Sequence, residues 1–236
     1  MKNIFKRTAI CLLSLVLIFG AFYFGSKGNE AQMANSNNVD SAPIIIVDAG
    51  HGGFDGGAVA SDGTSEKDIN LKIALQVGEM LSINGFEVIY TRIEDTGTED
   101  NIDASISRRK VSDLNNRLAL MSKHSDSVFV SIHLNKFTTS SASGAQVFYS
   151  KSFDDAKDLS VSIQNSIVSL IQPENTRVVK KGTSSTFLLD KAKVPAVIVE
   201  CGFLSNAAEL QLLKTEEYQK QMAFAIFCGI VNYFYK

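Results

Sequence analysis

The chain has 236 residues, of which 45% are hydrophobic, so it is long enough to bury a sizeable core. Its formal net charge of −2 gives no electrostatic basis for binding nucleic acid. Three cysteines, Cys11, Cys201 and Cys228, are an odd number without metal-type spacing, which argues against a disulfide framework and favours small buried apolar residues.

The N-terminus has the pattern of an export segment. Lys2, Lys6 and Arg7 precede an uncharged run of 18 residues at positions 8–25. This length lies between a long signal peptide and a short membrane span, and no convincing cleavage site follows. We therefore predict a signal peptide or uncleaved membrane anchor at 1–25, a polar tether at 26–42, and a catalytic domain at 43–236. The domain is expected outside the cytoplasmic membrane, which it contacts only through the N-terminal segment.

Strand and helix patterns alternate along the remaining chain. Apolar runs predict strands at residues 44–47, 86–91, 128–132, 145–149, 186–189 and 195–201. Helical spacing predicts helices at 68–84, 107–123, 154–171, from 206 onward, and at 215–234. This alternation predicts a single α/β domain whose largely parallel, twisted sheet has helices on both faces. In such folds the active site lies at the C-terminal ends of the strands.

A glycine-rich loop follows the first predicted strand and carries His51. Glu66 follows at the start of the next helical pattern. Imidazole and carboxylate both suit zinc, so this segment is a candidate first half of a metal site. The alternatives are a phosphate-binding loop or a plain turn with one stray histidine. Neither GxxxxGK[ST] nor GxGxxG occurs here, which disfavours the phosphate loop.

Two further residues stand at strand ends. His133 follows the strand 128–132, and Asn135 points to the same side if the chain stays extended. Glu200 ends a buried strand, where a carboxylate is costly unless it is paired, protonated or metal-bound. The alternative for Glu200 is a structural salt bridge, for example with Arg117. Two histidines and two carboxylates match a hydrolytic zinc centre, although spacing leaves open which glutamate binds and which acts as the base.

Three sequence blocks carry a family resemblance. VDAGHGGFDGGAV with the nearby SEKDINLKIA, then SIHLN, then PAVIVECGFLSN resemble the zinc-dependent N-acetylmuramoyl-L-alanine amidases of the Amidase_3 type, across about residues 43–236. The resemblance implies that His51, Glu66 and His133 bind one zinc ion (Zn2+) per domain. It implies that Glu200 is the catalytic carboxylate.

Three other residues are expected to support the site or contact substrate. Arg117 matches a recurrent arginine of the family, and Asn135 matches an asparagine that often follows the second histidine. Asp48 is expected to orient His51, as carboxylates often do for metal-bound imidazoles.

The resemblance also implies the reaction. The family cleaves the amide between N-acetylmuramic acid and the L-alanine of peptidoglycan stem peptides. Residues 136–143 leave no room for the site-blocking helix that some members insert, and the 236 residues contain no wall-binding repeats. Both features are most like the CwlD type of spore-cortex amidase, which prepares muramic acid for δ-lactam formation and hence germination. The expected partners are peptidoglycan and a regulatory protein.

Two other functions stay open from the sequence. The first is another zinc cell-wall peptidase, such as a carboxypeptidase acting within the stem peptide. The second is a non-catalytic wall-binding module, although the presence of all four site residues disfavours it.

Overall fold

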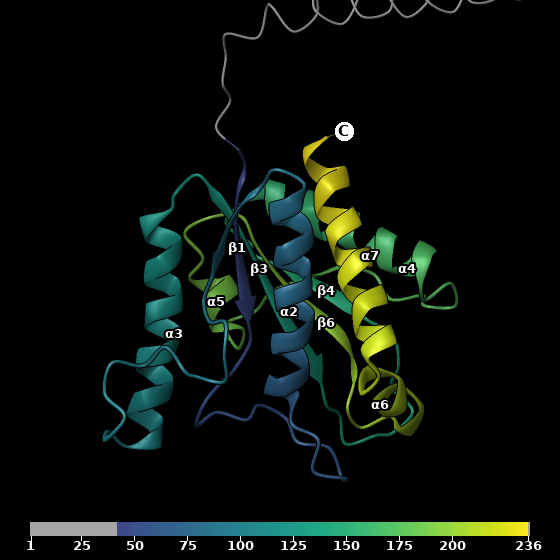
Figure 1. Cartoon of the computed structure of the whole chain (residues 1–236), viewed down its shortest axis with the longest axis horizontal. Coiled ribbons are helices and arrows are strands. Elements are labelled where there is room, and N and C mark those ends of the chain that lie inside the picture. The colour runs from purple at the N-terminus through teal and green to yellow at the C-terminus, as the bar shows by residue number, and fades with distance from the viewer. Residues whose placement is uncertain (1–41, 236) are drawn as a thin grey trace, which may run out of the picture. The chain divides into compact units, whose positions relative to one another are not determined.

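The computed structural model describes residues 42–235, and its centre is a six-stranded sheet (Figure 1). The strand order is β2-β1-β3-β6-β4-β5. The strands are β1 (Ile44–Ala49), β2 (Glu87–Tyr90), β3 (Ser127–Asn135), β4 (Gln146–Tyr149), β5 (Lys180–Lys181) and β6 (Ala196–Phe203). The first three and β6 pair in parallel, whereas β4 runs antiparallel to β6. The predicted α/β fold with a largely parallel sheet is confirmed.

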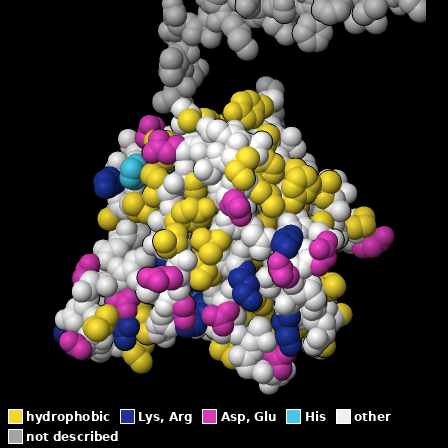
Figure 2. Space-filling view, in the orientation of Figure 1, with side chains coloured by type: hydrophobic (Ala, Val, Ile, Leu, Met, Phe, Trp, Pro, Cys, Tyr) yellow, Lys and Arg dark blue, Asp and Glu magenta, His cyan; other side chains and the backbone are white. Residues whose placement is uncertain are grey.

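Helices cover both faces of this sheet. The helices α2 (Glu66–Ile83), α4 (Asp154–Leu170) and α7 (Glu216–Phe234) pack together on one face. The other face is covered by α3 (Ile106–Lys123) and the short α5 (Phe187–Asp190), and α6 (Ala207–Leu213) precedes α7. The outer surfaces of α2 and α7 mix charged and hydrophobic side chains (Figure 2).

The alternation of strand side chains builds a core on each side of the sheet. Ile45 and Val47 of β1 join the cluster under α2 and α7, whereas Ile46 joins the cluster under α3 and α5. Because the central strands are covered on both faces, their sequences are continuous apolar runs. Asp48 is buried within such a run and Glu200 is partly buried, so each of these ionisable groups needs a partner or a function.

One predicted element is wrong. Residues 186–189 were expected to form a strand, but Phe187–Asp190 is the helix α5. The Thr186 hydroxyl accepts a hydrogen bond from the Thr183 amide at 2.9 Å, and the Thr186 amide donates to the Thr183 carbonyl at 2.9 Å. These contacts form a tight turn that leads the chain into the helix. An apolar run this short does not distinguish a strand from a helix by its pattern.

The predicted export segment at 1–25 lies outside the described residues, as does most of the tether at 26–42. Both stay predictions. Among residues 42–235, no helix combines the length and the apolar character needed to cross a membrane. Cys201 is fully buried, as expected from its position in β6.

Candidate metal centre and catalytic site

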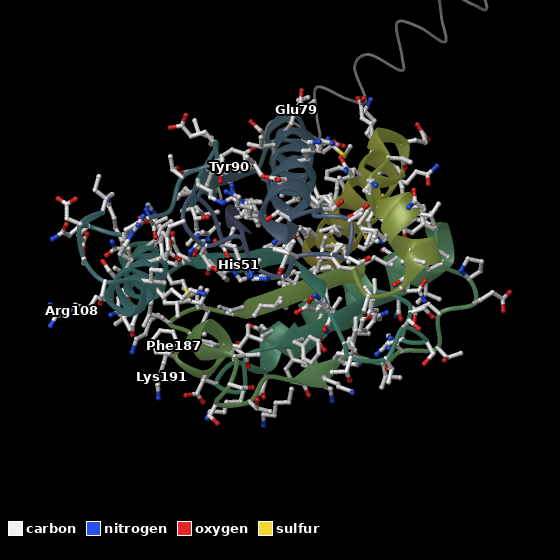
Figure 3. All side chains as sticks on the ribbon, turned by 90° about the horizontal axis from the view of Figure 1, so that it is seen from below. His51, Glu79, Tyr90, Arg108, Phe187 and Lys191 are labelled. Carbon is white, nitrogen blue, oxygen red and sulfur yellow. The ribbon has the colours of Figure 1, made fainter. Side chains whose placement is uncertain are left out.

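Two imidazoles and one carboxylate meet at the C-terminal edge of the sheet. Oε1 of Glu66 lies 3.3 Å from Nε2 of His51 and 2.9 Å from Nδ1 of His133. The three donor atoms lie within 4.8 Å of one another. Figure 3 views the molecule from below and shows His51 near the middle of this edge. Neutral nitrogen and carboxylate oxygen are typical zinc donors, so this set fits a zinc ion with a position left for water.

The turn after β1 places His51 against His133. His51 has a positive φ of 63°, which is uncommon for a residue other than glycine and is typical of functional sites. Gly50 passes so close to His133 that a Cβ there would lie 2.3 Å from the imidazole ring. Only glycine at this position therefore lets the loop and the ring occupy the same edge of the sheet.

Asp55 holds the imidazole of His51 in orientation. Its Oδ2 lies 2.9 Å from Nδ1 of His51, and its Oδ1 forms an ion pair with Lys110 at 3.0 Å. This contact leaves Nε2 of His51 facing Glu66, as in the carboxylate–histidine pairs of metal sites. The prediction that Asp48 performs this role is wrong, because the side chain of Asp48 lies in the sheet and bonds elsewhere. Asp55 is the site residue that sequence reasoning missed.

The charges of the metal-free site favour a cation. Burial lowers the pKa of His51, but the Asp55 and Glu66 carboxylates outweigh it and raise the pKa to about 9. Burial raises the pKa of Glu66, but the two histidines hold it far below its usual range. The Asp55 and Glu66 carboxylates thus keep His51 protonated when no metal is bound. A bound metal ion would replace this positive charge.

Asp48 is the buried anion of a separate network beside the site. It is fully buried and accepts hydrogen bonds from Arg117, Ser131 and Thr91, the last at 2.7 Å. Burial raises the pKa of Asp48, but Arg117 and the two hydroxyls hold it below its usual value. The carboxylate therefore stays ionised in the interior because it is fully paired.

Arg117 connects this network to the loop that carries His51. Its guanidinium pairs with Asp113 at 2.8 Å and donates to the carbonyl of Ala49 at 3.1 Å and to that of His51 at 2.8 Å. The alternative in which Arg117 pairs with Glu200 is not what the structure shows. Arg117 instead contacts the backbone of the loop that carries His51, and its predicted role in support or substrate binding stays a prediction.

Replacing Arg117 by Met is expected to lower the free energy of unfolding by about 3–5 kcal/mol, because Asp48 would be left buried and unpaired. Denaturant unfolding of the metal-free protein measures this without a contribution from zinc. Arg108→Met is the matched control: Arg108 is exposed on the same helix and should change stability by less than about 0.5 kcal/mol. Equal effects of the two substitutions would contradict the assigned role of Arg117.

Glu200 lies in β6 directly across from His133 in the β3–β6 ladder. Its Oε2 is buried and has no hydrogen-bond partner within residues 42–235. Burial and the nearby Glu66 charge raise the pKa of Glu200 to about 7, against the opposing effect of His133 and His51. A carboxyl group with a pKa near neutral pH suits general acid–base catalysis.

The raised pKa predicts a pH-dependent stability of the metal-free protein. Because the pKa of Glu200 is higher in the folded protein than its unfolded value of about 4.5, protonation of this carboxyl favours the folded state. This contribution to stability is fully present below about pH 4.5 and is lost as the pH rises through about 7. Glu200→Gln cannot ionise, so at pH 8 it should be more stable than the wild type by on the order of 1–3 kcal/mol, with little difference at pH 4.5. Thermal unfolding in chelator across this range checks the prediction, and a pH-independent difference would contradict it.

A cavity of about 240 Å³ opens at this edge, between α3 and α5. Its lining includes His51, Asp55, Lys110, His133 and Leu188. Residues 136–145 contain no helix or strand, as expected from the short spacing after β3. Asn135 ends β3 in register with Phe203, and its predicted role toward substrate stays a prediction.

Comparison with known proteins gives one consistent family. The family model described as N-acetylmuramoyl-L-alanine amidase matches residues 45–232. The germination-specific N-acetylmuramoyl-L-alanine amidase of Bacillus subtilis (strain 168) is 34% identical over 94% of this chain and 92% of its own length.

Solved structures agree with this match. The CwlD amidase from Clostridioides difficile, in complex with the GerS lipoprotein, is 42% identical and has a TM-score of 0.78, over 81% of this chain and 98% of its own. The amidase AmiC2 of Nostoc punctiforme is 28% identical with a TM-score of 0.69, over 82% and 98%.

Proposed function

The chain belongs to the N-acetylmuramoyl-L-alanine amidase family, and from this premise we propose that it is a zinc-dependent hydrolase. Its substrate is peptidoglycan, and the bond is the amide between N-acetylmuramic acid and the L-alanine of the stem peptide. The observation that carries the zinc proposal is that the ligand atoms of His51, Glu66 and His133 lie within 4.8 Å of one another. Beside them, Oε2 of Glu200 has no hydrogen-bond partner within residues 42–235.

Each residue has a distinct task in this mechanism. His51, Glu66 and His133 would hold the zinc ion, and Asp55 keeps Nε2 of His51 directed at Glu66. A bound zinc ion would supply Lewis-acid polarisation of the scissile carbonyl and a lowered pKa for the attacking water. Glu200 would take a proton from the attacking water as its oxygen bonds to the carbonyl carbon. It would pass that proton to the L-alanine nitrogen as the carbon–nitrogen bond breaks, which gives a muramoyl carboxyl group and a neutral amine.

The experiment that tests this function is digestion of purified peptidoglycan by the protein, with zinc or with chelator, followed by mass spectrometry. The expected products are muramic acid without peptide and stem peptides with a free L-alanine amine, formed only with zinc. Cleavage within the stem peptide would indicate the alternative peptidase, and no cleavage in zinc would indicate a wall-binding module.

We also propose that the domain acts outside the cytoplasmic membrane. The support is the basic start, the uncharged run at 8–25 and the polar residues 26–42. A reporter enzyme fused after Lys236 should be active only when exported. A reporter active only in the cytoplasm would rule the proposal out.

A role in spore-cortex maturation is the finer proposal. It rests on the germination-specific relative, which matches 94% of this chain. Removal of the stem peptide would then be the first step toward muramic δ-lactam. Muropeptide analysis of spores from a strain lacking the protein should find no δ-lactam, and a normal δ-lactam content would contradict this role.

A regulatory partner protein is the last part of the proposal. Its support is the similar CwlD amidase, whose structure is a complex with the GerS lipoprotein. Affinity purification of the exported protein from sporulating cells should recover one stoichiometric partner. Recovery of the protein alone, with full activity, would contradict the need for a partner.

A further inference from the structure

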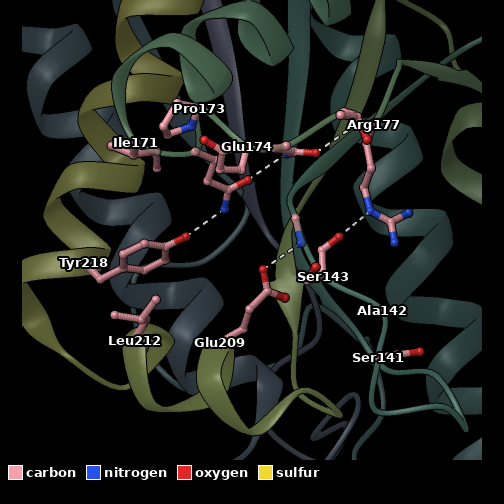
Figure 4. Close-up of a pocket in the computed structure, with 14 residues that line it drawn as sticks. Ser141, Ala142, Ser143, Ile171, Pro173, Glu174, Arg177, Glu209, Leu212 and Tyr218 are labelled. Carbon is pink, nitrogen blue, oxygen red and sulfur yellow. Dashed lines mark hydrogen bonds between the residues drawn. The ribbon is translucent and has the colours of Figure 1, made fainter.

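A second cavity lies beside the antiparallel strand β4. Its volume is about 520 Å³, within the range of small-ligand pockets, and it is open to solvent. Figure 4 shows Arg177 on one side of it and Leu212 and Tyr218 on the other. Residues 141–144 and 171–177 supply most of the remaining lining. The lining thus combines apolar side chains with the guanidinium of Arg177 and the carboxylates of Glu174 and Glu209.

Arg177 is fixed in position but has no acidic partner within residues 42–235. Its Nε donates to the Ser143 carbonyl at 2.6 Å, and its Nη1 donates to Oε1 of Gln146 at 3.1 Å. Arg109 and Arg117, in contrast, both pair with carboxylates. An arginine held only by neutral groups has no carboxylate partner of its own, and its Nη2 is left to bind an anion.

Two carboxylates also line this cavity, those of Glu209 and Glu174. Oε1 of Glu209 accepts a hydrogen bond from the Gly144 amide at 2.7 Å, and Oε2 accepts one from the Phe203 amide at 2.8 Å. Glu209 therefore fixes the two loops together and does not neutralise Arg177. Neither carboxylate forms an ion pair with Arg177 within residues 42–235, so its Nη2 is left for a ligand.

The side chain of Gln146 connects Arg177 to the part of the sheet that carries Glu200, the proposed catalytic carboxylate. Gln146, which accepts the bond from Arg177, is the register partner of Glu200 in the β4–β6 ladder. Such partners have Cβ atoms about 5 Å apart and project to the same face of the sheet. An extended peptide advances about 3.3–3.6 Å per residue, so a chain leaving the reacting amide reaches Arg177 within two or three residues.

An aromatic strip joins the arginine to the loop after β3. The guanidinium carbon of Arg177 lies 4.6 Å from the ring centre of Phe203, and the ring of Phe137 lies 5.0 Å from that of Phe203. Phe203 is buried, whereas Phe137 is 48% exposed although its amide is held by Oγ of Ser205 at 3.0 Å. The exposed ring offers an apolar contact for the peptide between the reacting amide and the guanidinium.

We propose that Arg177 binds a carboxylate of the leaving stem peptide, beyond its L-alanine, and that Phe137 contacts the intervening peptide. This inference rests on the proposed amidase function and names the part of the substrate that the second cavity takes. Arg177 is thus a specificity residue that selects peptides with a free carboxylate. The Nη2 group of its guanidinium, which has no partner within residues 42–235, would donate to that carboxylate.

The test compares two muramoyl-peptide substrates that differ only in whether the peptide carboxyls are free or converted to carboxamides. The wild-type protein should prefer the free carboxylates in kcat/KM by about 10- to 100-fold. Arg177→Gln should remove this preference by lowering kcat/KM for the carboxylate substrate only. Arg177→Lys should retain part of it, since it keeps the charge but loses the planar guanidinium that Ser143 and Gln146 hold in place.

Arg108→Gln is the matched control, since Arg108 is an exposed arginine that projects from the periphery in Figure 3. It should keep the full preference. Equal losses on both substrates in Arg177→Gln, or no preference in the wild type, would overturn the proposal.

If the wild-type protein cleaves neither substrate, the proposed function fails. Calorimetric titration of the free stem peptide then decides the role of Arg177. Binding of the stem peptide to the wild type but not to Arg177→Gln supports the proposed role of Arg177. Equal binding to both proteins, or no binding to either, overturns that role.

Discussion

Glu200→Gln is expected to keep the fold and the zinc ion while lowering turnover by about 100- to 10,000-fold. Glutamine is nearly isosteric with glutamate, but its amide cannot accept a proton at neutral pH. The buried Oε2 of Glu200 has no hydrogen-bond partner among the described residues, so the substitution breaks no contact of that atom. The loss should therefore appear in kcat rather than in stability.

Three measurements on this one variant separate the roles open to Glu200. If it were a metal ligand, zinc content would fall together with activity. If it were only an ion-pair partner, the melting temperature would fall while the folded fraction kept normal turnover. Glu87→Gln, at an exposed position in β2, controls for the change of charge. A folded, zinc-loaded Glu200→Gln protein with wild-type turnover would refute the mechanism.

The sequence predicts the site well where the site depends on sheet geometry. His133 belongs to a strand and His51 follows one, and parallel neighbours end at the same edge, so their meeting follows from two apolar runs. Glu66 joins them because α2 begins with it at that edge. Glu200 was recognised because an ionisable group in a buried strand needs a compensating partner or a function.

The sequence does not predict the contacts made by loops. Asp55 reaches His51 only because the chain makes a tight turn between Gly52 and Asp55. In this turn the Gly52 amide donates to the Asp55 carbonyl at 2.9 Å, and the Asp55 amide donates to the Gly52 carbonyl at 3.0 Å. No periodicity encodes such a turn, so the sequence pattern points instead to Asp48, the nearer carboxylate in the strand. The position of Arg177 is likewise not predictable from the sequence, because it lies in an irregular segment. Its connection to Glu200 is through Gln146, which bonds to Arg177 and pairs with Glu200 in the β4–β6 ladder.

His133→Ala is expected to lose bound zinc and, with it, activity. The substitution removes one of three ligands, and loss of groups that merely support ligands already costs about 10- to 100-fold in metal affinity. The fold should persist, because Oε1 of Glu66 still accepts hydrogen bonds from the Leu134 amide at 3.0 Å and from Asn70 at 3.2 Å. The variant thus separates metal binding from folding.

Metal analysis after dialysis, and melting temperatures with and without added zinc, measure the effect. A ligand that binds only the folded state at 100 times its Kd stabilises it by about 2.7 kcal/mol, so zinc should raise the melting temperature of the wild type but not of His133→Ala. His124→Ala is the matched control, because His124 only ends α3 and lies outside the ligand cluster. Zinc occupancy at wild-type affinity in His133→Ala would place the metal on other residues. Retention in His124→Ala with loss in His133→Ala would locate it at the edge where β1 and β3 end.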